Sequence, residues 1–170
     1  MTLADLNRVP KARFVGELGT IFEHSAWVAE RAFAHRPFSS VDALHRSMME
    51  AVRSATANEQ LTLLCAHPEL AGAEAGAGML TAHSSGEQGR LGLTSLSPQE
   101  FRRISDINRR YRARFGFPCI VALALHADRA SVLDEMEGRL SNSREAEFRT
   151  ALEQIGHIAR ARLKRIIREG

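Results

Sequence analysis

Lysine, aromatic residues and long apolar runs are scarce in this sequence, and each shortage excludes a class of protein. There is one Trp and one Tyr, and the few Val and Ile runs offer little material for a β-sheet. The only lysines are Lys11 and Lys164, so a Schiff-base enzyme is improbable. The longest strongly apolar stretch, residues 119–125, is far too short to cross a bilayer. We therefore expect no membrane partner.

The two cysteines and seven histidines show no metal-binding pattern. Cys65 and Cys119 lie inside apolar runs and form no CxxC or zinc motif. We expect both to be small buried side chains in a reducing compartment. The histidines are scattered without HxxxH or HExxH spacing, so no metal site is predicted. The start, MTLADLNRVP, lacks the apolar core of a secretion signal, and we expect a cytoplasmic protein.

The residues that are abundant favour helices. Ala, Leu, Arg and Glu dominate the composition, and all four are good helix formers. A length of 170 residues fits one domain with a substantial core. We predict an all-α protein: one domain over residues 1–170, a bundle of about seven to eight helices with one long loop that contains Gly and Ser.

Two predicted helices lead to a histidine at a helix end. Residues 40–55 carry apolar side chains in helical phase behind a Ser40 cap. A second helix over residues 58–66 ends at His67, because Pro68 disfavours a helical conformation in the residue before it. An imidazole fixed in this way can transfer a proton near neutral pH. The alternative is a structural histidine in a turn, without a catalytic role.

A third helix begins at residues 97–100, where Ser97 and Glu100 form a capping box and Pro98 takes the first helical position. It runs to Gly116, and its core face is predicted to carry Phe101, Ile104, Ile107, Tyr111 and Phe115. Its many arginines are compatible with RNA binding, but a solvated face is commoner. The apolar run that follows, residues 119–127, is predicted to be helical because no other segment offers a partner strand.

The last predicted helix, from residue 142 or 143 to about Arg168, places Arg162 on its apolar face. The other members of that face are Phe148, Leu152, Ile155, Ala159 and Ile166. Arg160, Lys164 and Arg168 point toward solvent. A buried arginine must meet a carboxylate, carbonyl groups or an anionic ligand, because burying a lone charge is costly. The alternative is an arginine that snorkels past the edge of the core.

Residues 71–96 are rich in Gly and Ser and are predicted to form the long loop, of a kind that is usually functional or mobile. In HSSGEQGRLGL, residues 83–93, the small residues allow a ligand to approach the backbone closely. Ser84 and Ser85 offer hydroxyls, Glu87 a carboxylate and Gln88 an amide. A solvated surface loop is the alternative.

Six motifs stand in the order seen in one enzyme family and cover residues 14–163. They are FVGELGTIFEHSAWVAERA, RPF, HPELAG, SSGEQ followed by LGL, NRRYRARFGFPCIVAL, and IARARL. The chain resembles the 2-oxo-4-hydroxy-4-carboxy-5-ureidoimidazoline (OHCU) decarboxylases of urate breakdown. The resemblance implies conversion of OHCU to (S)-allantoin and CO2. It also implies that no cofactor is needed, because C=N and C=O groups of the substrate ring can accept the electrons.

The resemblance also assigns residues to the site. His67 would be the proton donor, and Glu87 and Arg162 would complete the catalytic set around one small acidic substrate. The implied substrate-binding residues are Pro68, Ser84, Ser85, Gly86, Gln88, Cys119, Ile120, Val121, Ala122 and Leu123, the last five through their backbone. The sequence departs from the family where Cys119 replaces a common Phe, and where SSGEQ replaces the commoner Ser-Ala-x-Glu-Gln.

The family tends toward dimers, so we expect a homodimer that binds a small molecule and no nucleic acid. Two alternatives stay open. One is a nucleic-acid-binding module built on RRISDINRRYRAR and ARLKRIIRE, whose affinity would fall steeply with salt. It leaves His67, Arg162 and the SSGEQ segment without a role. The other is a lyase of the same fold that acts on another ureido or imidazolinone acid.

Overall fold

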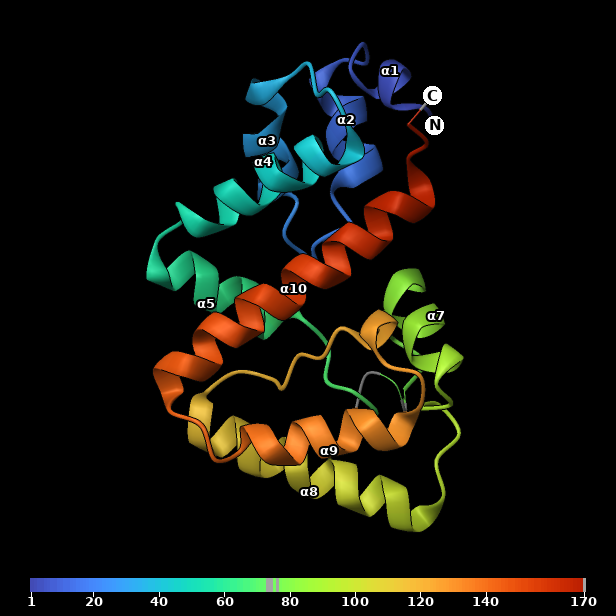
Figure 1. Ribbon diagram of the computed structural model, residues 1–170, viewed down its shortest axis with the longest axis vertical. Helices are drawn as coiled ribbons and strands as arrows, with labels where there is room; N and C mark the ends of the chain where they lie inside the picture. Colours follow the sequence, from blue (N-terminus) through green and yellow to red (C-terminus); the bar gives the residue numbers. More distant parts are fainter. Residues whose placement is uncertain (73–74, 76, 170) are drawn as a thin grey trace. The chain divides into compact units, whose positions relative to one another are not determined.

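A computed structural model describes residues 1–72, 75 and 77–169 of the chain, and these residues form an all-α protein. They contain nine α-helices and two short 3-10 helices (Figure 1). The pairing of β type within them is a single isolated bridge between Thr2 and Arg168. Because α1 and α3 have only four and six residues, seven longer helices remain, as the sequence predicts. None of the described helices combines the length and the apolar character needed to span a membrane.

The chain divides into two compact units. One comprises Met1–Ala66 with Gly156–Gly170, and the other comprises His67–Ile155. The first contains α1 (Leu3–Leu6), α2 (Lys11–Leu18), α3 (Trp27–Ala32), η1 (Phe33–His35), α4 (Val41–Arg53), α5 (Ala57–Ala66) and the end of α10 (Arg144–Ile166). The second contains the start of α10 with α7 (Ala82–Arg90), α8 (Pro98–Phe115), η2 (Leu123–Leu125) and α9 (Arg129–Arg139).

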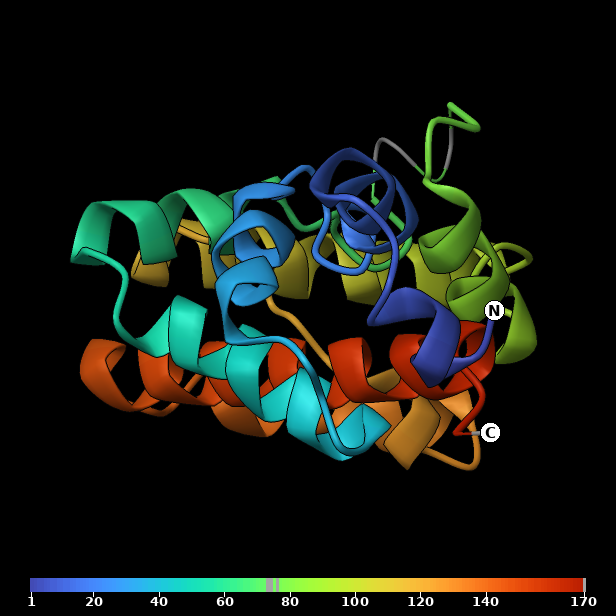
Figure 2. The same ribbon diagram turned by 90° about the horizontal axis from the view of Figure 1, so that it is seen from above.

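In the first unit the two chain ends lie together, as Figures 1 and 2 show. The amide of Leu3 donates to the carbonyl oxygen of Arg168 over 2.8 Å. The carboxylate of Glu169 accepts from the amide of Val41 at the start of α4. Helix α4 begins at its Ser40 cap, as predicted, and packs against α3. Hydrogen bonds therefore join the N-terminal and C-terminal segments of the chain within this unit.

In the second unit α8 packs against α9 and supplies much of the core. The predicted capping box at Ser97 is present, and α8 ends at Gly116, whose φ of 85° is left-handed. The rings of Tyr111 and Phe115 lie 4.5 Å apart. Phe101 is an exception, because its side chain is 52% exposed. It lies in the first turn of α8, where it lines a surface groove instead of the core.

The predicted long loop is wrong for residues 82–90, which form helix α7. The side chain of Thr81 caps this helix by accepting from the amide of Ser84. Gly86 and Gly89, which weaken helices, have nothing within 4 Å of an added Cβ. They thus lie on the open side of α7. Residues 73, 74 and 76 of the predicted loop lie outside the described residues.

The helix predicted over residues 119–127 is also wrong for residues 119–122, 126 and 127. Residues 119–122 are buried and non-helical, and only the 3-10 turn η2 follows them. Their peptide groups bond sideways to side chains of α9 and α10, so they do not form i to i−4 bonds. Cys119 is buried as predicted, but Cys65 is exposed, because α5 buries its neighbours Leu63 and Leu64 instead.

Helix α10 buries Arg162, which is 1% exposed, as the helical phase predicts. Arg160, Lys164 and Arg168 are exposed, also as predicted. The buried stripe of α10 is nevertheless rotated from the predicted face. It consists of Glu147, Ala151, Ile155, Ile158, Ala159, Arg162 and Leu163, whereas Phe148, Leu152 and Ile166 are only half-buried. The buried face thus includes a glutamate, Glu147, which the sequence pattern does not place there.

Candidate active site

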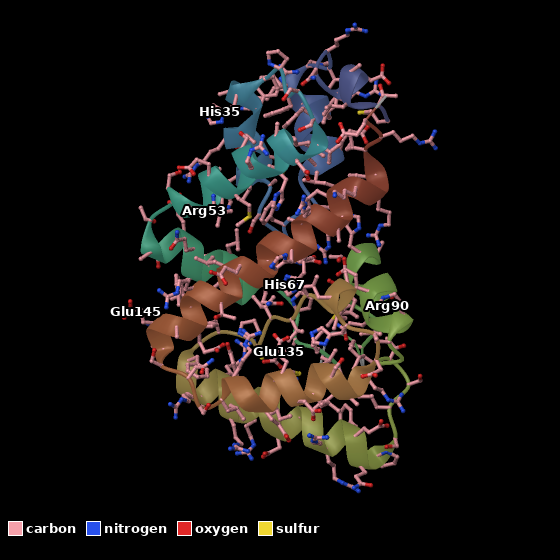
Figure 3. The ribbon with its side chains drawn as sticks, viewed as in Figure 1. His35, Arg53, His67, Arg90, Glu135 and Glu145 are labelled. Carbon is pink, nitrogen blue, oxygen red and sulfur yellow. The ribbon has the colours of Figure 1, made fainter. Side chains whose placement is uncertain are left out.

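His67 follows the last residue of α5 and stands in a bend, half-buried (Figure 3). Pro68 stops the helix there, since the residue before a proline is biased away from the helical conformation. Two residues on, the carboxylate of Glu69 accepts from Nε of Arg112 on α8 over 2.7 Å. This ion pair fixes the turn that follows the imidazole.

Helix α7 presents its predicted site residues on two different sides. Ser84 and Gln88 are 3% and 2% exposed, and Glu87 beside them is half-buried. Residues three and four apart share one face of a helix, which explains why these three lie together. Ser85 and Gly86 fall on the exposed side.

Gln88 joins α7 to the segment that follows His67. Its Oε1 accepts from the amide of Ala71 over 2.9 Å, and its Nε2 donates to the carbonyl oxygen of Glu69 over 3.4 Å. Asn108 of α8 donates to the carbonyl oxygen of Leu70 over 2.9 Å. These three bonds hold residues 69–71 in place.

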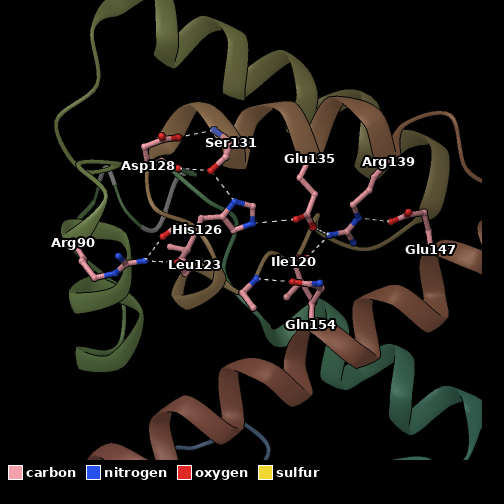
Figure 4. A network of polar contacts seen from close by, with 11 residues as sticks. Arg90, Ile120, Leu123, His126, Asp128, Ser131, Glu135, Arg139, Glu147 and Gln154 are labelled. Carbon is pink, nitrogen blue, oxygen red and sulfur yellow. Dashed lines mark hydrogen bonds and ion pairs between the residues drawn. The ribbon is translucent and has the colours of Figure 1, made fainter.

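Arg90 joins the same helix to the 119–126 segment. Its Nη2 donates to the carbonyl oxygen of Leu123 and, over 3.1 Å, to that of His126 (Figure 4). Through Gln88 and Arg90, α7 therefore links the three predicted site segments of the second unit, 67–71, 84–88 and 119–123.

The 119–123 segment is buried throughout. The amide of Ala122 donates to Oε1 of Gln154 over 2.7 Å, and the carbonyl oxygen of Ile120 accepts from Nη1 of Arg139 over 2.7 Å. Burial raises the pKa of the Cys119 thiol to about 12. Cys119 therefore stays a neutral thiol at physiological pH and does not act as a nucleophile.

Arg162 belongs to the first unit, where it meets the kind of partner that a buried arginine requires. Its Nη2 lies 2.9 Å from Oε1 of Glu23, and both side chains are 1% exposed. Its Nη1 donates to the carbonyl oxygen of Ile21 over 3.1 Å. A carboxylate and a carbonyl oxygen thus compensate the buried charge and orient the guanidinium.

Comparison with known proteins identifies the family. The family described as OHCU decarboxylase matches residues 7–164. The chain belongs to this family. The OHCU decarboxylase of Haloferax volcanii is 42% identical over 96% of this chain and 94% of its own length. Those of Halalkalicoccus jeotgali and Mus musculus are 38% and 36% identical, over 98% and 96% of this chain and 92% and 91% of their own lengths.

Solved structures agree with this membership. A crystal structure of (S)-allantoin synthase superposes with a TM-score of 0.76 at 33% identity, over 98% of this chain and 54% of that one. The chain thus spans about half of that protein. A crystal structure of OHCU decarboxylase in the presence of (S)-allantoin superposes with a TM-score of 0.68 at 16% identity, over 88% of this chain and 96% of that one. It shows that the fold is shared.

The structure of this OHCU decarboxylase family member also shows polar residues that sequence reasoning missed. Glu23 stands in the first family motif next to the apolar pair Ile21 and Phe22, and a charge in such a place signals a buried ion pair. Arg139 and Gln154 carry no comparable signal. No group of three or more His, Cys, Asp or Glu that could hold a metal occurs among the residues searched, which are the described ones.

Proposed function

We propose that this chain converts OHCU to (S)-allantoin and CO2 in urate breakdown, without a cofactor. The observation that carries the proposal is membership of the OHCU decarboxylase family over residues 7–164. The 42% identity with the Haloferax volcanii decarboxylase over nearly the full length of both chains supports it. The motifs HPEL and SSGEQ are present as well.

In the proposed reaction the substrate loses a carboxylate from a tetrahedral ring carbon that also bears a hydroxyl. The C–C bond breaks, CO2 leaves, and the electron pair passes into the neighbouring C=N and C=O groups of the ring. The hydroxyl group loses its proton, so that the carbon that carried the carboxylate becomes a ring carbonyl. His67 delivers a proton from one face to the adjacent ring carbon, which bears the ureido group, and this determines the handedness of the product. A well-placed general acid contributes about 10²–10⁴ in rate. Glu87 orients His67 or the substrate hydroxyl.

Arg162 binds oxygen atoms of the substrate in this proposal. Its planar guanidinium suits bidentate recognition of oxygen pairs. Because Glu23 and the carbonyl oxygen of Ile21 hold the guanidinium, the group is oriented before substrate arrives. Preorganised charge of this kind favours the transition state, since no reorganisation is needed during the reaction.

Backbone groups of Cys119, Ile120, Val121, Ala122 and Leu123 would complete the binding site. Donors among them would stabilise the negative charge that develops on the ring. Pro68 and Ser84 would line the site, and Gln88 would add its second amide hydrogen. Ser85 and Gly86, on the exposed side of α7, would serve at the rim.

The test is to give the purified protein freshly generated OHCU and to follow loss of substrate by absorbance and formation of chiral product by circular dichroism. We expect allantoin to form faster than in buffer and as the S enantiomer. A buffer-like rate with racemic product would refute the activity. A rapid reaction with a different ureido or imidazolinone acid, but not with OHCU, would favour a lyase of altered specificity.

The charge pattern of α8 argues against a nucleic-acid partner. Arg103 is paired with Glu137 over 2.8 Å. Arg109 and Arg110 both pair with Asp106. Several of the arginines that suggest RNA binding are thus partly neutralised by neighbouring carboxylates, and the unscreened charge that attracts phosphates is reduced.

We further propose that residues 1–170 act as one catalytic domain, that the protein is a homodimer, and that it works in the cytoplasm. The family match extends across both compact units, which supports a single functional domain. Light scattering at micromolar concentration tests the dimer, and a monomer mass would refute it. Fractionation of cells that express the protein tests the compartment, and recovery outside the cytosol would refute it.

A further inference from the structure

We propose that Arg139, which lies outside the predicted site, is a positioning residue for the decarboxylation. By donating a hydrogen bond to the carbonyl oxygen of Ile120, it would hold the 119–123 segment so that the opposite edge of this segment faces the substrate. The inference rests on the proposed function, because it assigns Arg139 a part in the same reaction.

Arg139 lies at the centre of a buried polar network (Figure 4). The residue is 6% exposed. Its Nη1 donates to the carbonyl oxygen of Ile120 over 2.7 Å and to Oε1 of Glu135 over 3.1 Å. Its Nε donates to Oε2 of Glu147 over 3.0 Å. The guanidinium is therefore fixed from two sides by carboxylates while it points at one peptide group.

The two carboxylates are themselves held in place. The second oxygen of Glu135 lies 3.0 Å from Nε2 of His126. Glu147 accepts from the hydroxyl of Tyr111 and, over 2.7 Å, from Nδ2 of Asn142. A buried ion pair adds little stability compared with apolar side chains of the same size. An arrangement this elaborate around one backbone carbonyl therefore points to a role in placing that carbonyl.

The contacts of the segment show which edge is held. Along an extended chain, the N–H and C=O of one residue point to the same edge, and successive residues alternate. Arg139 donates a hydrogen bond to the carbonyl oxygen of Ile120, and Gln154 accepts one from the amide of Ala122. These two peptide groups belong to residues two positions apart. Side chains of α9 and α10 thus form hydrogen bonds with one edge of the segment.

The other edge belongs to Val121, which is 2% exposed. Within residues 1–72, 75 and 77–169, its amide donates no hydrogen bond to a protein acceptor. A buried backbone donor without a partner is costly, and a bound substrate could supply the acceptor. By fixing the opposite edge of the segment, Arg139 would therefore set the position of the Val121 amide relative to the substrate ring.

The experiment compares Arg139→Lys with wild type, and Arg103→Lys serves as the matched control. Arg103 donates to Glu137 of α9 over 2.9 Å and 2.8 Å, so the control also loses a bidentate pair near α9, yet it does not touch residues 119–123. We would measure kcat, KM and the enantiomeric excess of allantoin. Hydrogen exchange of the peptide that covers residues 117–126 reports whether the segment has loosened.

We expect kcat of Arg139→Lys to fall by on the order of 100-fold, the cost of a small misplacement of a reacting group, with a smaller change in KM. Exchange should rise in residues 117–126 and not elsewhere, and Arg103→Lys should behave like wild type. Gln154→Leu removes no charge and is a second probe of the same edge. It should lower kcat and loosen the same peptide, even if Arg139→Lys folds poorly.

Unchanged kcat in Arg139→Lys or in Gln154→Leu, with wild type active, would overturn the positioning role and leave the proposed function intact. So would a rise in exchange across the whole chain with normal kcat per folded molecule, because that is the result expected of a merely structural pair. A wild-type protein without decarboxylase activity would overturn the proposed function and the positioning role together.

Discussion

Arg162→Lys separates the proposed binding role of Arg162 from its contribution to stability. Arg162 contacts Glu23 over 2.9 Å and donates to the carbonyl oxygen of Ile21 over 3.1 Å. Lysine keeps the charge opposite Glu23, so the loss of about 3–5 kcal/mol that follows removal of one member of a buried pair is avoided. It cannot keep the planar fork, and we expect the bond to Ile21 to be lost.

The structural cost follows from that single bond. A hydrogen bond that involves a charged group is worth about 1.5–3 kcal/mol. At about 2–4 °C per kcal/mol for a protein of this size, the melting temperature should fall by roughly 3–12 °C. The variant should still be folded at the assay temperature. If Arg162 binds substrate oxygens, kcat/KM should fall by on the order of 100-fold, as when a preorganised donor is removed.

Arg160→Lys is the matched control, two residues earlier on α10. Its guanidinium donates to both oxygens of Asp42, over 3.1 Å and 3.0 Å, at an exposed position. The same substitution there should leave kcat/KM unchanged and have little effect on the melting temperature, because an exposed ion pair contributes little to stability. If Arg162→Lys melts lower as calculated but turns over OHCU at the wild-type rate, then the arginine is structural and the assignment of a binding role is wrong.

Two further predictions concern histidines. Replacing His67 with Ala should lower kcat by about 10²–10⁴-fold without a large change in melting temperature. The control His157→Ala, at an exposed position of α10, should leave kcat unchanged. Near-normal turnover by the His67 variant would show that His67 is not the general acid. Burial lowers the pKa of His45, whose Nε2 donates to the carbonyl oxygen of Gly156 over 2.8 Å. Below about pH 6.5 the unfolded chain therefore takes up this proton more readily than the folded chain, and stability falls. Denaturant titrations between about pH 8 and about pH 5.5 should show a larger loss for wild type than for His45→Gln, which keeps a donor without titrating, and equal losses would contradict this origin.

The helices that the sequence predicts correctly carry their own boundary signals. Ser40 caps α4 and Ser97 caps α8, and these bonds span only three residues. Helix α7 has a comparable Thr81 cap, yet its glycines favour a loop in any reading of composition. Its helix is formed in the tertiary structure, where Gln88 and Arg90 bond to segments far along the chain.

The sequence by itself determined the all-α class, the helix ends at Ser40, His67 and Ser97, and the burial of Arg162, because caps and helical phase depend on neighbours within one or two turns. Only the tertiary structure decided what Arg162 meets, since Ile21 is 141 residues away. It also decided that residues 119–122 stay non-helical, because side chains 19 and 32 residues away form hydrogen bonds with the peptide groups of Ile120 and Ala122. No local pattern encodes a hydrogen bond whose partner is brought close by the packing of other helices.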